Sequence, residues 1–390
     1  MINRNLKIFF FMLVILGLAA LGFLSYRVSI NRGQMDRQVS VKTLKAESEL
    51  TAQRKKEASR IANENFYQKL KNGDPVSILV IGDQIAAGAG SLNDISWDGQ
   101  LVTLLGKSYS SDIQVTKMTS FGSNIVSSWI TYNKAQQALI SQGKKESTFD
   151  CVMICTGYFD QTQLSYKEFH MFYENLIDRL IKANPRVVII PILENCMKDA
   201  NDYSANISEL SKYYGLNLID MKAAFYNDTK PYYELVQKDK LLPNNRGYSI
   251  YASQISEDIV RNVSEDKIVN YDFSAPLFES SSMLKGFQCL QTAESSGFTL
   301  SGGAYTSNRT GSSLTFTANR SVVYLEYNIA PKGGKFQVYL DDTLLSTVNT
   351  NSVAPLKRQL LISNTLNETH RIKLVALSKN AVSINGIITN

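Results

Sequence analysis

The sequence predicts an α/β domain with a parallel sheet, followed by a smaller all-β sandwich. Two changes along the chain lead to this prediction. Between about residues 77 and 264, short apolar runs alternate with amphipathic stretches of helical period, which is typical of βαβ units in a three-layer α/β/α domain. From about residue 271, Ser, Thr, Gly and Asn become frequent, and short runs of alternating polarity replace that rhythm, as expected of a β-sandwich.

Composition excludes few classes of protein. A length of 390 residues suggests about two domains, and 44% hydrophobic with 19% charged residues is ordinary for globular chains. The net charge of +6 comes from scattered basic residues that are not interleaved with aromatics. We therefore expect no nucleic-acid partner.

The N-terminal segment carries the longest apolar run. Ile8–Tyr26 is uncharged and, as a helix, would span roughly 28 Å, enough for a bilayer core. A cleaved signal peptide is the alternative, because Arg4 and Lys7 precede the run, but the run is long and its end is a poor cleavage site. We predict a cytoplasmic tail and transmembrane anchor over residues 1–26, which would make this a single-pass protein of the cell membrane with an extracytoplasmic body. Basic residues from Arg27 onward argue for the opposite orientation.

Residues 27–72 are polar and are predicted to form a helical stalk. The α/β domain is then expected over residues 73–268 and the β-sandwich over residues 269–390. The strands predicted in the α/β domain are Ser77–Ile81, Ile113–Met118, Phe149–Thr156, Arg186–Pro191 and Leu216–Asp220.

The clearest predicted helices are Ser165–Asn184 and Gly247–Val263. Asp341-Asp342 has the composition of a hairpin turn. The strands predicted in the sandwich are Val322–Tyr327, Lys335–Leu340, Gln359–Ile362, Arg371–Ala376 and Ala381–Ile388.

The four cysteines do not form a disulfide pattern, and we interpret them as small buried hydrophobic residues. His170 and His370 are far apart in the sequence, and no Cys or His spacing indicates zinc. We therefore expect neither a metal nor a cofactor.

Four short blocks resemble the SGNH/GDSL hydrolase superfamily. The first is Gly82-Asp83-Gln84 after the first strand, and the second is Ser120–Asn124. The third is Thr156–Asp160, and the fourth runs from Asp239 to Tyr248 and includes Leu-Pro-Asn-Asn-Arg-Gly-Tyr. This resemblance implies a flavodoxin-like three-layer domain whose site lies at the carboxyl ends of the strands. The C-terminal region resembles the jelly-roll modules of some carbohydrate-active members.

The same resemblance implies that most of the catalytic groups are replaced. Gln84 stands where the family has the nucleophilic serine, Phe159 where it has the oxyanion-binding asparagine, and Leu242 where it has the histidine base. Gly122 matches the glycine whose N–H helps to bind the oxyanion, and Asp239 matches the carboxylate that orients the base. Without a hydroxyl and a base, covalent acyl transfer has no route.

We therefore predict a degenerate SGNH protein that binds its ligand and does not cleave it. The expected partners are a carbohydrate or acylated polymer, or a protein of envelope-polysaccharide biosynthesis. The residues that we expect near the ligand are Asp83, Gln84, Gly122, Asn124, Trp129, Tyr158 and Asp160.

Three alternatives stay open at this point. An active acyl-ester hydrolase or O-acetyltransferase with a rearranged site would bring a serine and a histidine together in the cleft. The β-sandwich could be the working part, with the α/β domain as its spacer. Asp83, Asp160 and Asp239 could form a carboxylate cluster, although capping of loops and helices is the favoured interpretation of these residues.

Overall fold

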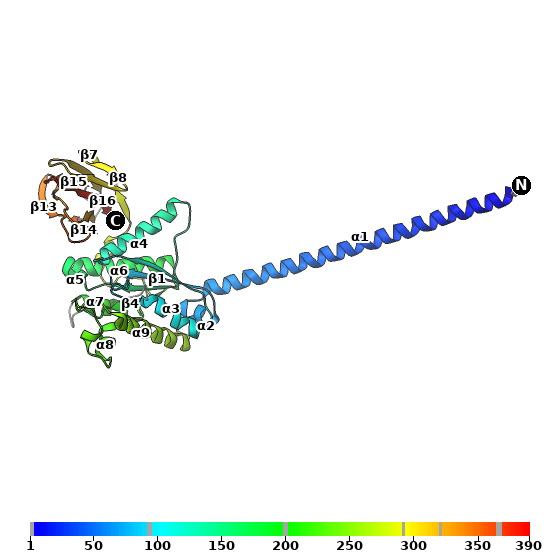
Figure 1. The fold of residues 1–390 in the computed structure, drawn as a ribbon, viewed down its shortest axis with the longest axis horizontal. Helices are drawn as coiled ribbons and strands as arrows, with labels where there is room; N and C mark the ends of the chain where they lie inside the picture. Colours follow the sequence, from blue (N-terminus) through cyan, green and yellow to red (C-terminus); the bar gives the residue numbers. More distant parts are fainter. Residues whose placement is uncertain (1–3, 92–95, 198–201, 291–292, 320–321, 364–368) are drawn as a thin grey trace. The chain divides into compact units, whose positions relative to one another are not determined.

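The computed structural model describes residues 4–91, 96–197, 202–290, 293–319, 322–363 and 369–390 (Figure 1). The chain divides into two compact units, Met1–Asn63 and Glu64–Asn390. The domain boundaries drawn from the sequence remain predictions.

The first unit is one helix, α1 (Arg4–Asn63), of 60 residues. The predicted transmembrane helix is wrong, and so is the single-pass membrane location that followed from it. Throughout the described residues, helices are either too short or too polar to cross a membrane. The apolar run Ile8–Tyr26 continues without a break into a charged sequence that begins at Arg27, so α1 as a whole is not an apolar helix. The first three residues of the predicted tail lie outside the described residues.

The second unit contains the predicted parallel sheet. Its strand order is β2-β1-β3-β4-β5, and every pairing between neighbours is parallel. The strands are β1 (Val76–Gly82), β2 (Ile113–Thr119), β3 (Cys151–Cys155), β4 (Val188–Leu193) and β5 (Ile219–Asp220). Each overlaps a strand predicted from the apolar runs.

Helices cover both faces of this sheet, because successive side chains of a strand point to opposite sides. Ile78 and Val80 of β1 belong to one hydrophobic cluster, and Leu79 and Ile81 belong to the other. The first face carries α2 (Phe66–Asn72), α3 (Trp97–Ser108), α8 (Met221–Tyr226) and α9 (Asn245–Ser264). The second face carries α4 (Ile125–Ser141), α6 (Tyr166–Ala183) and α7 (Asp202–Tyr214). The α/β/α arrangement predicted from the sequence is confirmed.

Local sequence fixes the ends of these helices. At the start of α6, Ser165 and Glu168 form a capping box in which each side chain accepts the other residue's backbone N–H. At the start of α9, the Asn244 side chain accepts the N–H groups of Arg246 and Gly247. Short helical elements α5 (Asp160–Gln163), η1 (Tyr232–Glu234) and η2 (Glu279–Met283) complete the helical segments used below.

The C-terminal region is an antiparallel β-sandwich of two sheets. One sheet has the order β13-β12-β15-β10-β7; the other has β14-β11-β16-β9-β8, with β6 also paired to β16. The hairpin predicted at Asp341-Asp342 joins β12 to β13, and both residues adopt positive φ (48° and 65°). The strands are β6 (Gln288–Leu290), β7 (Glu294–Ser296), β8 (Thr299–Ser301), β9 (Ala304–Ser307), β10 (Ser313–Asn319), β11 (Val323–Ile329), β12 (Lys335–Leu340), β13 (Thr343–Asn349), β14 (Leu356–Ser363), β15 (Thr369–Ala376) and β16 (Val382–Thr389).

The sandwich packs on the α4 and α6 face of the α/β domain. Tyr324 of β11 lies in the same hydrophobic cluster as the side chains of these helices, and its hydroxyl donates to Glu168 Oε1 at 2.6 Å. Lys134 of α4 forms an ion pair of 2.6 Å with the buried Glu326. Residues from the sandwich can therefore reach loops of the α/β domain.

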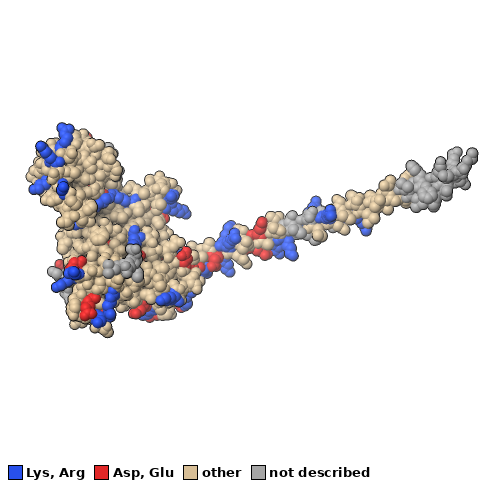
Figure 2. Space-filling view, viewed as in Figure 1, with Lys and Arg blue, Asp and Glu red and all other residues tan. Residues whose placement is uncertain are grey.

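Charged side chains of both signs lie on the visible surface of the molecule (Figure 2). Along α1 and over the α/β domain, acidic groups lie among the lysines and arginines. Over the β-sandwich, the charged side chains visible on this face are lysines and arginines.

Candidate functional site

The first block forms a sharp turn at the carboxyl end of β1. Gly82 has φ of +154°, and a Cβ at this position would lie 1.9 Å from the Cys155 carbonyl oxygen, so only glycine fits. The fully buried Asp83 follows, and its Oδ1 accepts the N–H of Ile85 at 2.7 Å. The turn leaves Gln84 half-buried at the top of the sheet.

Gln84 contacts the second block directly. Its Oε1 accepts the backbone N–H of Gly122 at 2.7 Å. This N–H is the group that the resemblance assigns to oxyanion binding. The glutamine side chain therefore occupies a catalytic donor as well as the position of the nucleophile.

An arginine from the β-sandwich fixes the same glycine from its other side. Arg358 of β14 donates from Nη1 to the Gly122 carbonyl at 2.9 Å. Gly122 has φ of +61°, and a Cβ there would lie 3.1 Å from Arg358 Nη1, so a side chain would crowd the guanidinium. Gln163 Nε2 donates to the same carbonyl at 3.3 Å. The loop is thus held by both domains.

Two expected ligand contacts instead hold the second and third blocks together. Asn124 is buried and caps α4, where its Oδ1 accepts the N–H of Ser127 at 2.9 Å. Asp160 is fully buried and accepts the Ile125 N–H and the Thr156 hydroxyl, both at 2.7 Å. Burial raises the pKa of Asp160 to about 6, although both hydrogen bonds act in the opposite direction.

The two expected aromatic contacts differ in exposure. Trp129 is buried in the core, where its Nε1 donates to Asn175 Oδ1 at 2.8 Å and its ring packs edge-on against Phe172. The structure therefore does not bring Trp129 to a ligand surface. Tyr158 is half-buried, and its ring makes an edge contact with Phe159 at 5.1 Å between centroids. Tyr158 thus stays at the edge of the site, beside the residue that replaces the family's asparagine.

The fourth block has a leucine at the position of the family's histidine, and its carboxylate forms a local turn. Asp239 is exposed, and its Oδ1 accepts the N–H groups of Leu241 (2.9 Å) and Leu242 (3.0 Å), which closes a local turn. The Leu242 side chain packs against the hydrophobic cluster on the first face of the sheet. The carboxylate therefore orients backbone groups here.

A family model described as the GDSL-like lipase/acylhydrolase family matches residues 80–250, which include all four blocks. The chain contains a GDSL-like lipase/acylhydrolase domain. No curated protein sequence matches the chain.

Solved structures extend the similarity of fold to the β-sandwich. A two-domain esterase active on acetylated mannans, co-crystallised with mannopentaose, is 15% identical, with a TM-score of 0.68 over 84% of this chain and 96% of that one. A second structure of a two-domain esterase active on acetylated mannans gives a TM-score of 0.67 at 15% identity, over 83% and 93% of the two chains. A catalytic mutant of an acetylxylan esterase from Geobacillus stearothermophilus is 18% identical and covers 48% of this chain and 95% of that one, with a TM-score of 0.37. The first two matches show that both domains of this chain have counterparts of similar fold.

Sequence reasoning missed a buried acid beside the GDSL-like turn. Glu194 follows β4, and its carboxylate accepts the N–H of Tyr158 at 2.8 Å and the thiol of Cys155 at 3.7 Å. Burial raises the pKa of Glu194 to about 7. Burial and then the charge of Glu194 raise the pKa of Asp83 well above its usual value. The signal was available, since Glu194 directly follows an apolar strand that ends at the same edge of the sheet.

The alternative in which Asp83, Asp160 and Asp239 form a carboxylate cluster gains no support as a metal site. Among the described residues, no three acidic, histidine or cysteine side chains are grouped so that they could hold an ion. All four cysteines are free. Cys151 and Cys155 are buried as predicted, whereas Cys196 and Cys289, which were also expected to be buried, are only half-buried.

Both histidines have serine partners outside the four blocks. On α6, His170 Nδ1 lies 3.3 Å from Ser280 Oγ. In the sandwich, His370 Nε2 lies 3.0 Å from Ser363 Oγ, and its Nδ1 lies 2.8 Å from Asp341 Oδ2. This Ser–His–Asp arrangement was not predicted, because its members come from three segments, and it buries both the serine (7% exposed) and the histidine (5%).

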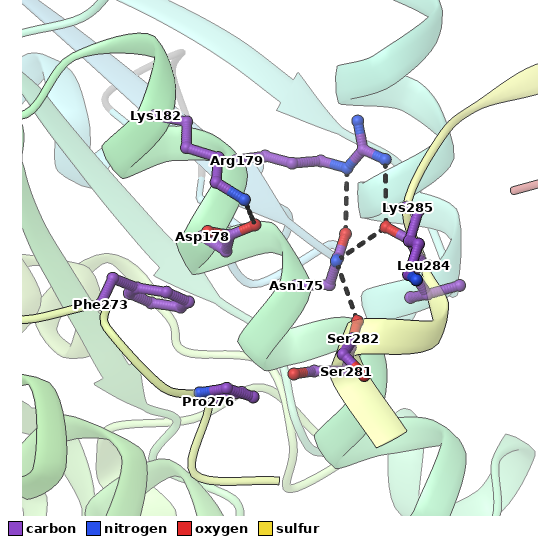
Figure 3. Close-up of a pocket in the computed structure, with 10 residues that line it drawn as sticks. All are labelled: Asn175, Asp178, Arg179, Lys182, Phe273, Pro276, Ser281, Ser282, Leu284 and Lys285. Carbon is purple, nitrogen blue, oxygen red and sulfur yellow. Dashed lines mark hydrogen bonds and ion pairs between the residues drawn. The ribbon is translucent and has the colours of Figure 1, made fainter. Parts of the chain in front are cut away.

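A hollow of about 350 Å³ lies away from the four blocks, between α6 and the segment that leads to the sandwich (Figure 3). Arg179 lines this hollow, and its Nε donates to Asn175 Oδ1 at 2.9 Å. Its Nη2 donates to the carbonyl oxygens of Gly286 (2.5 Å) and Leu284 (3.5 Å). The guanidinium therefore fastens the connecting segment to the α/β domain.

Proposed function

We propose that this protein is a catalytically silent GDSL-like protein that binds a polysaccharide and does not hydrolyse acyl esters. One observation carries the proposal. The side chain at the nucleophile position, Gln84, accepts a hydrogen bond from the oxyanion-binding N–H of Gly122 at 2.7 Å.

The chemistry of an amide explains why this contact matters. A glutamine side chain offers no hydroxyl or thiol to attack an ester carbonyl. Its oxygen also takes the place in which the oxyanion of an acyl intermediate would be bound. An ester would have to displace the Gln84 side chain before its carbonyl oxygen could reach the Gly122 N–H.

Loss of the base supports the same conclusion. Leu242 cannot accept a proton, and the nearby Asp239 carboxylate is engaged by two backbone N–H groups. Because nucleophile and base act as one unit, losing both removes the covalent mechanism.

The class of ligand comes from the fold relatives. The two-domain relative acts on acetylated mannans and was crystallised with mannopentaose, and its fold matches 84% of this chain. In the third block, the half-buried Tyr158 offers the kind of aromatic and polar contact that sugars use. We therefore propose a mannan-type or similar polysaccharide as the ligand.

The test combines an activity assay with a binding assay on the full chain. We expect hydrolysis of p-nitrophenyl acetate and of acetylated mannan at the rate in buffer, together with calorimetric binding of mannopentaose. Turnover that Asp239→Ala abolishes would overturn the proposal. Turnover that Ser363→Ala abolishes would also overturn it, and would assign the activity to the sandwich.

A restored site provides the matched positive control. The triple variant Gln84→Ser, Phe159→Asn and Leu242→His supplies nucleophile, oxyanion donor and base together, and we expect it to gain measurable turnover. The single variant Gln84→Ser should stay inactive, because a serine without a base is a weak nucleophile. Turnover by the single variant would contradict the proposal, since it would show that a working base is already present.

A further inference from the structure

A groove lies at the carboxyl ends of β4 and β5, beside the four blocks. It encloses about 920 Å³ and is formed by α8, the loop that follows it, and the start of η1. Its inner side is lined by Asn195, which lies just after β4, and by Asp220, which ends β5. In open α/β sheets this edge is the usual place for ligands, and the volume is within the range of ligand sites.

Tyrosine side chains line the groove without being fully buried. Tyr226 ends α8 and is 90% exposed, whereas its neighbour Phe225 is buried in the core. Tyr232 is half-buried, and its hydroxyl accepts from Asn195 Nδ2 at 3.1 Å and donates to the Lys240 carbonyl at 3.2 Å. These bonds hold the Tyr232 ring in place, while Tyr226 offers its aromatic faces to solvent. An exposed aromatic ring beside amides and hydroxyls suits the apolar faces and hydroxyl groups of a sugar.

The charges that line the groove balance. Asp220 and Asp228 carry negative charge, and Lys222 and Lys230 carry positive charge, so the lining has no formal net charge. Asp228 is also paired with Arg246 at 3.1 Å. The lining therefore selects for neither a polyanion nor a polycation, and an uncharged ligand fits it best.

Asn195 links the lining of the groove to the fourth block. Its Nδ2 donates to the Leu241 carbonyl of the fourth block at 3.1 Å, as well as to Tyr232. The residue before it, Glu194, holds the backbone of Tyr158. These two hydrogen bonds tie the inner wall of the groove to the backbone of the third and fourth blocks.

We propose that this groove is a binding subsite for an uncharged oligosaccharide, with Tyr226 as its stacking platform and Tyr232 as its fixed wall. The inference rests on the proposed polysaccharide-binding function and names the surface that recognises the sugar chain. The oligosaccharide that binds in this groove carries no charge.

Calorimetry of the full chain with mannopentaose tests the proposal. We expect Tyr226→Ala to weaken binding roughly tenfold, the loss that corresponds to one aromatic contact. Tyr233→Ala is the matched control, because Tyr233 is adjacent and 69% exposed but does not line the groove. It should bind as the wild type does. Both variants should keep the wild-type melting temperature, since each removes an exposed side chain.

The outcomes separate this inference from the proposed function. Equal binding by wild type, Tyr226→Ala and Tyr233→Ala would overturn the groove while leaving polysaccharide binding in place. Tighter binding of trigalacturonic acid than of mannopentaose would overturn the claim of a neutral ligand. Failure of the wild type to bind mannopentaose would overturn both the groove and the proposed class of ligand, whereas ester turnover lost in Asp239→Ala would overturn the silent function alone.

Discussion

Asp160→Asn should change how the stability of the α/β domain depends on pH. The Asp160 carboxyl is fully buried, and burial raises its pKa from 3.8 to about 6. Asparagine keeps the size of the side chain. Its Oδ1 can still accept the N–H of Ile125, and its Nδ2 can donate to Thr156 once that hydroxyl turns. The substitution therefore removes the titration and preserves the contacts.

The sign and size of the effect follow from the pKa. The pKa of Asp160 is higher in the folded protein than in the unfolded chain. Between these two pKa values, the folded protein therefore binds more protons than the unfolded chain. This contribution to stability is fully present below a pH of about 4 and is lost as the pH rises through about 6. A difference of about 2 pKa units corresponds to roughly 3 kcal/mol. The Asp160→Asn variant has no titrating group at this position, so its stability does not fall by this amount as the pH rises.

Urea unfolding followed by tryptophan fluorescence measures the difference. The chain has two tryptophans, Trp97 and Trp129, and both are buried in the α/β domain. Between about pH 4 and about pH 8, the free energy of unfolding of Asp160→Asn relative to wild type should rise by roughly 3 kcal/mol.

Asp272→Asn is the control for this experiment. Asp272 is exposed, and the backbone N–H of Ser274 lowers its pKa, so any change with pH should be small and of opposite sign. If the stability of Asp160→Asn relative to wild type stays constant or falls with rising pH, Asp160 does not have a raised pKa in the folded protein.

Three further predictions concern the turn, the sandwich and their contact. Gly82→Ala should destabilise the α/β domain by about 3 kcal/mol or more in urea unfolding, because its Cβ would collide with the Cys155 carbonyl; a loss under 1 kcal/mol would contradict the geometry. Ser363→Ala should destabilise the sandwich by about 1 kcal/mol in thermal unfolding, because it removes one hydrogen bond. Neither this variant nor the wild type should react with a fluorophosphonate probe. Labelling of the wild type alone would show that Ser363 is a reactive serine. Arg358→Ala should speed amide hydrogen exchange at Gly122 by about tenfold, because the loop loses its contact with the sandwich; unchanged exchange would show that Gln163 holds the loop alone.

The regular part of the fold could be predicted because its signals are local. Buried strands such as Cys151–Cys155 are continuous apolar runs, and α6 has a helical apolar stripe preceded by a capping box. Within the sandwich, β12 and β15 bury alternate residues and were found. By contrast, β7 and β8 are short and fully exposed, so no alternation marks them in the sequence.

The wrong prediction of a membrane anchor shows where local sequence patterns mislead. The apolar run at residues 8–26 has the length of a membrane span, but it belongs to a helix of 60 residues that soon becomes charged. A window of sequence does not show how far its helix continues.

The sequence predicted which residues lie at the site, but it did not predict which of them contact one another. The four blocks located Gln84, Gly122 and Leu242, because each follows a recognisable strand or precedes a helix. The hydrogen bond from Gly122 to Gln84 depends on how two loops meet, and the one from Arg358 joins residues 236 positions apart. Such contacts require the packed domains.

The central claim is that Gln84 and Leu242 leave the GDSL-like site without acyl-transfer chemistry. The most direct measurement is the initial rate of p-nitrophenyl acetate hydrolysis by the purified full chain and by Asp239→Ala. We expect both rates to equal that of buffer. A wild-type rate above buffer that falls to the buffer rate in Asp239→Ala would contradict this claim.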